Sequence, residues 1–143
     1  MAASDSQVAT WALKFKHNFL RPVTAIRNAL AFDNPRIQQD AEWEPLIVTP
    51  GHPDYPSGHC AYAGAATAIL RKFFDTDTIE NASYTYPLFG VTCYWSSYSA
   101  LAKDVIDARV WGGIHTRTAD EHAYNLGLQI AEYEFNNFMR PLR

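Results

Sequence analysis

Three short motifs contain the residues of this chain that are best suited to bind and transform an anion. In chain order they are Lys14-x6-Arg21-Pro22, Pro56-Ser57-Gly58-His59 and Arg109-x5-His115. The lysine and the two arginines can neutralise a multiply charged anion, and planar guanidinium groups suit pairs of oxygens. The serine adds a hydroxyl and the glycine a backbone N–H, while the histidines exchange protons readily near neutral pH. The set therefore predicts chemistry on phosphate or on an anion of similar shape.

The spacing of the motif residues predicts the elements that position them. Lys14 and Arg21 are seven residues apart, about two helical turns, so the sequence predicts both cations on one face of a helix that ends at Pro22. The small residues after Ser57 predict a tightly packed helix with Ser57 near its N-cap. Because a helix N-terminus carries unpaired N–H groups, it would face the anion.

These motifs resemble those of the type 2 phosphatidic acid phosphatase (PAP2) superfamily, which unites vanadium-dependent haloperoxidases with class A acid phosphatases and lipid phosphatases. The superfamily pattern is Lys-x6-Arg-Pro, Pro-Ser-Gly-His and Ser-Arg-x5-His-x3-Asp. The chain matches the first two parts fully and the third in Arg109-x5-His115. Residues 18–27 and 110–117 are more similar to the haloperoxidase branch than to the phosphatases, and the resemblance extends from about Trp11 to Arg140.

Two positions depart from the phosphatase pattern. Ala108 stands where the phosphatases have serine, and four residues instead of three separate His115 from Asp120. In the phosphatases that aspartate orients a nucleophilic histidine, and Asp120 could still reach the ring if the intervening turn is irregular. Haloperoxidase-like members tolerate this spacing, so the departure in spacing favours that branch.

The resemblance implies a vanadate-dependent enzyme that oxidises halide with hydrogen peroxide and passes the product to a small organic acceptor. His115 would ligate vanadium through one ring nitrogen, His59 would act as acid and base, and Lys14 would polarise the peroxide. The residues implied to hold the vanadate oxygens are Lys14, Arg21, Ser57, Gly58 and Arg109. Phosphate could occupy the same site, because the two anions have nearly the same shape and charge.

Two other functions stay open. The chain could be a soluble acid phosphatase that hydrolyses phosphate monoesters, with His115 as nucleophile and His59 as proton donor. It could also be a non-catalytic or incomplete subunit that needs a partner chain. Taken singly, each motif residue has a plainer explanation, since a helical lysine is usually solvated and Ser57 could merely cap its helix. The remaining histidines, His17, His52 and His122, are predicted to lie at the surface.

Length and composition set further bounds. The 143 residues make one domain, 48% of them are hydrophobic, and the chain is therefore globular rather than disordered. The net charge of −3 and the pI of about 5.9 argue against nucleic acid or a membrane as partner. The sequence shows neither a signal peptide nor an apolar run of the ~18 residues that would span a bilayer, which leaves the localisation open. Cys60 and Cys93 are predicted to be free thiols.

The predicted fold is all-α, a helical bundle with the oxyanion site between core helices. The helices are predicted at about 5–20, 22–30, 57–74, 95–108 and 118–138. A proline-rich extended loop over 31–56 would deliver Ser57 to the site, and the β-prone segment 84–91 is predicted to be an ordered loop. Haloperoxidases of the resembling family are much longer, so the single catalytic domain over 1–143 could lack N-terminal helices. A homo-oligomer or a complementing subunit would then cover the apolar faces left open.

Overall fold

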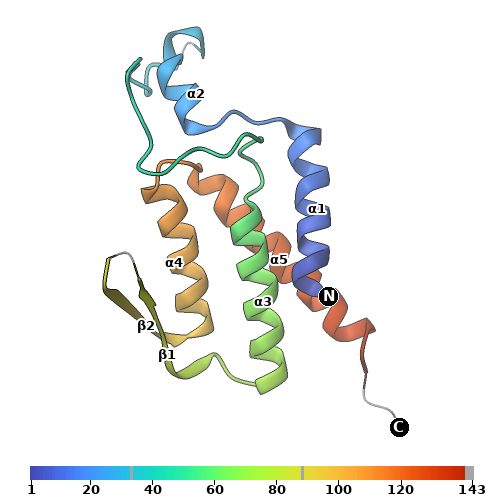
Figure 1. The fold of residues 1–143 in the computed structure, drawn as a ribbon. Helices are drawn as coiled ribbons and strands as arrows, with labels where there is room; N and C mark the ends of the chain where they lie inside the picture. Colours follow the sequence, from blue (N-terminus) through green and yellow to red (C-terminus); the bar gives the residue numbers. More distant parts are fainter. Residues whose placement is uncertain (33, 88, 141–143) are drawn as a thin grey trace.

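The computed structural model describes residues 1–32, 34–87 and 89–140, and most of them are helical (Figure 1). The helices and strands, in chain order, are α1 (Ala2–His17), α2 (Pro22–Arg27), the 3-10 helix η1 (Ala29–Phe32), α3 (Gly58–Phe74), β1 (Thr78–Tyr86), β2 (Val91–Ser97), α4 (Tyr98–Trp111) and α5 (Arg117–Asn137). The predicted helices at 57–74 and 118–138 are confirmed to within one residue at either end. The loop predicted over 31–56 is confirmed after η1, although Asp33 lies outside the described residues.

Four helices form the bundle, and α3 lies at its centre. It packs against α1, α4 and α5, and α5 crosses behind it (Figure 1). The buried apolar core consists mostly of alanine, as at Ala61, Ala65 and Ala123, so the helix backbones approach each other closely. The approach is close at Gly127 of α5, where an added Cβ would lie 2.2 Å from the carbonyl oxygen of Ala61. Small residues therefore set the spacing of the helices whose ends carry the motifs.

The prediction of an all-α fold is wrong in one respect, because a β-hairpin precedes α4. β1 and β2 pair antiparallel, with Tyr84 opposite Cys93. The segment 84–91 was predicted to be an ordered loop, but it contains the end of β1 and the first residue of β2, a strand rich in β-branched and aromatic residues; Leu88 lies outside the described residues. The helix predicted from residue 95 instead begins at Tyr98, because the Ser97 hydroxyl caps it by accepting from Ala100 N at 3.0 Å.

The first predicted helix, at 5–20, has the expected length but lies three residues earlier in the chain. α1 ends at His17, and Asn18 adopts a left-handed conformation with φ 49°. Arg21 has the extended backbone of an N-cap residue for α2, with ψ 154°. The cause is Pro22, which disfavours helical geometry in the residue before it. The prediction that Lys14 and Arg21 share one helix face is therefore wrong.

Many large apolar side chains lie on the surface of the bundle. On α1 and α3 they include Val8, Phe15, Tyr62 and Phe73, which are 70%, 64%, 54% and 72% exposed. The expected oligomer or complementing subunit stays a prediction, and these are the residues it would cover. Within the described part of the chain, no helix has the length and apolar character needed to cross a membrane.

Candidate oxyanion site

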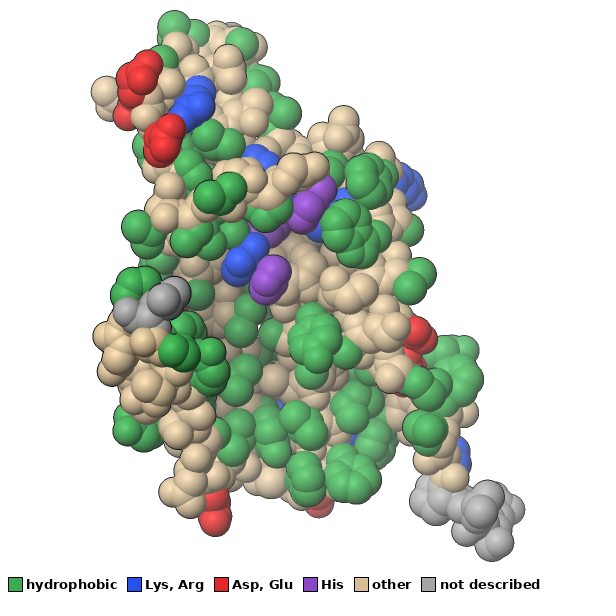
Figure 2. All heavy atoms as spheres, in the orientation of Figure 1, with side chains coloured by type: hydrophobic (Ala, Val, Ile, Leu, Met, Phe, Trp, Pro, Cys, Tyr) green, Lys and Arg blue, Asp and Glu red, His purple; other side chains and the backbone are tan. Residues whose placement is uncertain are grey.

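The motif residues meet at a pocket of about 300 Å³ at the N-terminal end of α3. Figure 2 shows histidine and basic side chains gathered there, above a face rich in hydrophobic side chains. The residues that line the pocket are Gln7, Trp11, Lys14, Pro50, His52, Gly58, His59, Tyr62, Arg109 and His115. Five of the seven predicted site residues are thus in the lining. The other two are Arg21, which contacts His115, and Ser57, which directly precedes Gly58.

Lys14 comes from the buried stripe of α1 and is only 1% exposed. Its Nζ donates to the carbonyl oxygens of Pro53 at 2.7 Å and Asp54 at 3.0 Å. These two bonds leave one of its three N–H donors for another acceptor. Burial, and next the charge of Arg21, lower the pKa of Lys14 to about 8, so it is still mostly protonated at neutral pH.

Arg21 reaches the same site from the start of α2, and it is 5% exposed. Its Nη1 donates to the carbonyl oxygen of Ile114 at 2.6 Å and lies 3.1 Å from Nε2 of His115. Its other contacts are with His52, through the carbonyl oxygen at 2.9 Å and the ring Nδ1 at 3.1 Å. His52 is half-buried at the pocket, so its predicted surface position is only partly right, whereas His17 and His122 are exposed.

His115 lies in the turn between α4 and α5 and is 4% exposed. Its Nδ1 contacts Oδ1 of Asp54. This contact would be an ion pair only if the imidazole ring were protonated. Burial lowers the pKa of His115 to about 4, and this effect outweighs the opposite effect of the neighbouring Asp54. At neutral pH the contact is therefore a hydrogen bond of a neutral imidazole with a carboxylate. Sequence reasoning missed Asp54, although its place three residues before Ser57 in a proline-rich loop was a usable signal.

Two buried donors at the site have no protein partner in the described structure. Ser57 occupies the N-cap of α3 as predicted, but its Oγ makes no capping bond; it is buried beside Cys60 and Asp120 without a hydrogen bond of good geometry. The buried Nε of Arg109, from the last turn of α4, is likewise unpartnered. Buried donors in native proteins are almost always satisfied. The first N–H groups of α3 add further donors at the same place. These groups together can bind an oxyanion.

Asp120 does not orient His115, contrary to what the phosphatase motif suggested. The reason is geometric: α5 begins at Arg117, which places Asp120 in the first helical turn beside α3. There its Oδ1 accepts a hydrogen bond from Sγ of Cys60 at 3.2 Å. Burial raises the pKa of Asp120 to about 6. Both Cys60 and Cys93 are free thiols, as predicted.

His59 is exposed on the first turn of α3, at the mouth of the pocket. Partial desolvation, and next the charge of Arg109, lower the pKa of His59. A neutral ring in this position can accept a proton from a bound molecule.

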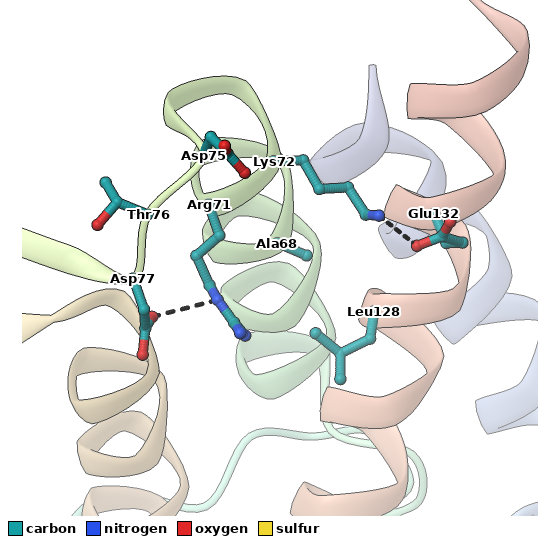
Figure 3. A pocket seen from close by; sticks show the side chains of 8 residues that line it. All are labelled: Ala68, Arg71, Lys72, Asp75, Thr76, Asp77, Leu128 and Glu132. Atoms are coloured by element: carbon teal, nitrogen blue, oxygen red, sulfur yellow. Dashed lines mark ion pairs between the residues drawn. The ribbon is translucent and has the colours of Figure 1, made fainter.

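A larger pocket, of about 480 Å³, lies at the other end of α3 and differs in chemistry. Figure 3 shows that its two cations face carboxylates: Arg71 pairs with Asp77 at 3.2 Å, and Lys72 pairs with Glu132. Because these cations are already paired, this pocket lacks the unpartnered donors of the first.

The fold and the site define a helical-bundle domain with a pocket lined by basic residues and histidines at a helix N-terminus. The model of the VCPO second helical-bundle domain matches residues 1–143, and the chain belongs to this family. Among solved structures, it is similar to an apo-type bacterial vanadium-dependent chloroperoxidase, with a TM-score of 0.77 and 23% identity over 92% of this chain and 33% of that one. It is also similar to a bacterial vanadium-dependent iodoperoxidase, with a TM-score of 0.76 and 29% identity over 94% of this chain and 31% of that one. The chain thus spans about a third of the length of these structures. Comparison with curated proteins gives no significant match.

Proposed function

We propose that this chain binds vanadate at the oxyanion site and supports the peroxide-dependent oxidation of halide. The observation that carries the proposal is the pair of buried, unpartnered donors, Ser57 Oγ and Arg109 Nε, beside a neutral His115. A neutral imidazole offers a lone pair to a metal, and hydroxyl and guanidinium groups bind the oxygens of an anion. Among the described residues there is no cluster of three or more metal-ligating side chains. The site therefore suits an oxyanion held by one histidine better than a bare cation.

In this proposal each motif residue has one role. Lys14, Arg21, Arg109, Ser57 and the N–H of Gly58 hold the oxygens of vanadate, and His115 ligates the metal. Bound vanadate supplies the activation of hydrogen peroxide without a change in its own oxidation state. Lys14 offers its remaining N–H donor to the developing negative charge. His59, at the pocket mouth, accepts a proton from hydrogen peroxide and later returns it. We also propose the wider placement in the PAP2 superfamily, on the three motifs.

The phosphatase function is the second candidate, and the contact between Asp54 and His115 favours it. A phosphohistidine mechanism needs a neutral, oriented imidazole as nucleophile, and Asp54 supplies a carboxylate that Asp120 does not. His59 would then protonate the leaving group. The same donors would hold phosphate, so the residues that bind the anion do not by themselves distinguish the two reactions.

One experiment separates these functions. The protein is purified without phosphate, and peroxide-dependent bromide oxidation is measured with and without orthovanadate, together with aryl phosphate hydrolysis on the same sample. We expect bromination that depends on vanadate and is lost in His115→Ala. Hydrolysis inhibited by vanadate, without bromination, would favour the phosphatase. If neither reaction occurs, the chain is an incomplete subunit, and binding of orthovanadate measured by calorimetry shows whether the site itself is formed.

His59→Ala provides the matched variant. Because the His59 side chain is exposed at the pocket mouth and makes no hydrogen bond with the described residues, we expect the variant to keep vanadate binding and to lose turnover. Full turnover in this variant would exclude His59 as the acid and base.

A further inference from the structure

Asp54 contacts three parts of the site: the segment after α1, Lys14 of α1, and the turn that leads into α5. Its backbone N–H donates to the carbonyl oxygen of Phe19 at 3.0 Å, and its own carbonyl oxygen accepts from Lys14 Nζ at 3.0 Å. Its side chain is 1% exposed, and its Oδ1 meets His115 Nδ1. The Oδ2 atom accepts from Oγ1 of Thr116 at 2.7 Å and from its backbone N–H at 3.3 Å. Both oxygens of the carboxylate are therefore engaged at the start of α5.

The two nitrogens of the His115 ring face groups of opposite kind. At Nδ1 the neighbour is the Asp54 carboxylate, which only accepts hydrogen bonds. At Nε2 the neighbour is Nη1 of Arg21, 3.1 Å away, which only donates. A hydrogen on Nδ1 satisfies both neighbours. A hydrogen on Nε2 would leave two acceptors face to face on one side and two donors on the other.

We propose that Asp54 is a positioning residue that fixes His115 in the tautomer with its hydrogen on Nδ1 and its lone pair on Nε2. This inference deepens the proposed function and rests on it, since the tautomer has its use when Nε2 ligates vanadium. The same carboxylate holds the ring against rotation, because Thr116 anchors its second oxygen. Asp54 also lies three residues before Ser57, so one short loop positions both the histidine and the N-terminus of α3.

The substitution that tests this is Asp54→Asn, which keeps the shape of the side chain. The two Thr116 donors require an acceptor, so the amide oxygen should take the place of Oδ2 and the NH₂ group should face His115. A donor at that position favours the lone pair on Nδ1 and moves the ring hydrogen to Nε2. An aspartate-to-asparagine change beside a catalytic histidine has this effect in serine proteases. We therefore expect the His115 tautomer to change without loss of the fold.

The readout is ¹⁵N NMR of the protein labelled at histidine, with the His115 signals assigned by His115→Gln. In the unaltered protein at pH 7 we expect hydrogen on Nδ1, and in Asp54→Asn hydrogen on Nε2. Calorimetry with orthovanadate should show at least a tenfold loss of affinity in the variant. Asp107→Asn is the matched control: it removes a carboxylate that pairs with Arg117 at the same helix start, and it should change neither measurement.

A His115 ring with its hydrogen on Nε2 in the unaltered protein would overturn the inference, and this measurement needs no variant. An unchanged tautomer in a folded Asp54→Asn protein would overturn it as well. Failure of the proposed function looks different: the unaltered protein would show the Nδ1–H tautomer and the variant the Nε2–H tautomer, but neither would bind orthovanadate.

Discussion

The crossing of α3 and α5 makes Gly127 the most informative position for testing the fold. A Cβ at residue 127 would lie 2.2 Å from the carbonyl oxygen of Ala61 and 2.6 Å from the backbone nitrogen of Ala65. Both are backbone atoms of α3, so no side-chain rotation can relieve the contact and the helices must separate. At an exposed helix position, Gly→Ala stabilises by about 1 kcal/mol. Overpacking of a core costs about 1–3 kcal/mol, and a clash with backbone belongs at the upper end.

The two effects together predict a net loss of about 2 kcal/mol for Gly127→Ala. In a domain of this size that loss lowers Tm by roughly 5–10 °C. Thermal and urea unfolding followed by circular dichroism measure the change. The control is Gly51→Ala, because a Cβ at residue 51 meets nothing within 4 Å, and we expect its Tm to change little. A Tm for Gly127→Ala at or above that of the unaltered protein would refute the close approach of the helices.

Three further predictions concern the site and the surface. Asp120→Asn should raise the free energy of unfolding at pH 8. The pKa of Asp120 is raised to about 6, so above that pH the folded protein carries a buried, unfavourable carboxylate that the variant lacks. The gain in stability should therefore shrink as the pH falls through 6 towards 4, where the carboxyl is protonated in the folded protein. A gain that does not depend on pH, in melting curves of both proteins over this range, would contradict the buried charge. Ser57→Ala should leave Tm nearly unchanged but weaken orthovanadate binding about tenfold, the effect of a lost hydrogen bond to a charged group; equal affinities in calorimetry would remove Ser57 from the site. The chain should associate with a second copy of itself through the apolar residues of α1 and α3. Sedimentation velocity should then give a species heavier than the 16.1 kDa monomer. The double variant Phe15→Ser, Phe73→Ser should shift the equilibrium towards monomer. A monomer at every concentration would count against this surface as an interface between copies.

The sequence predicted the helices of the bundle well where the local signals were strong. The small residues after Ser57 and the proline-rich loop before it placed α3 and its N-cap correctly. The hairpin was missed because its second strand ends at Ser97, the N-cap of α4, and the helix was predicted to begin at residue 95, so the end of this strand, with Trp95, was assigned to the helix. The shared helix face of Lys14 and Arg21 was wrong for a local reason as well, since the effect of Pro22 on the residue before it was given too little weight.

The sequence by itself determined which residue types could hold an anion, because motif spacing and side-chain chemistry are properties of the chain. Only the tertiary structure decided how these residues are positioned relative to one another. A turn after α1 brings Arg21 to the site that Lys14 also reaches, and Asp54 rather than Asp120 contacts His115. The carboxylate and the histidine are 61 residues apart in the chain, and the loop between α2 and α3 brings them together. A contact of this kind depends on how the helices pack around α3, and that packing follows from the small residues of the core rather than from the motifs.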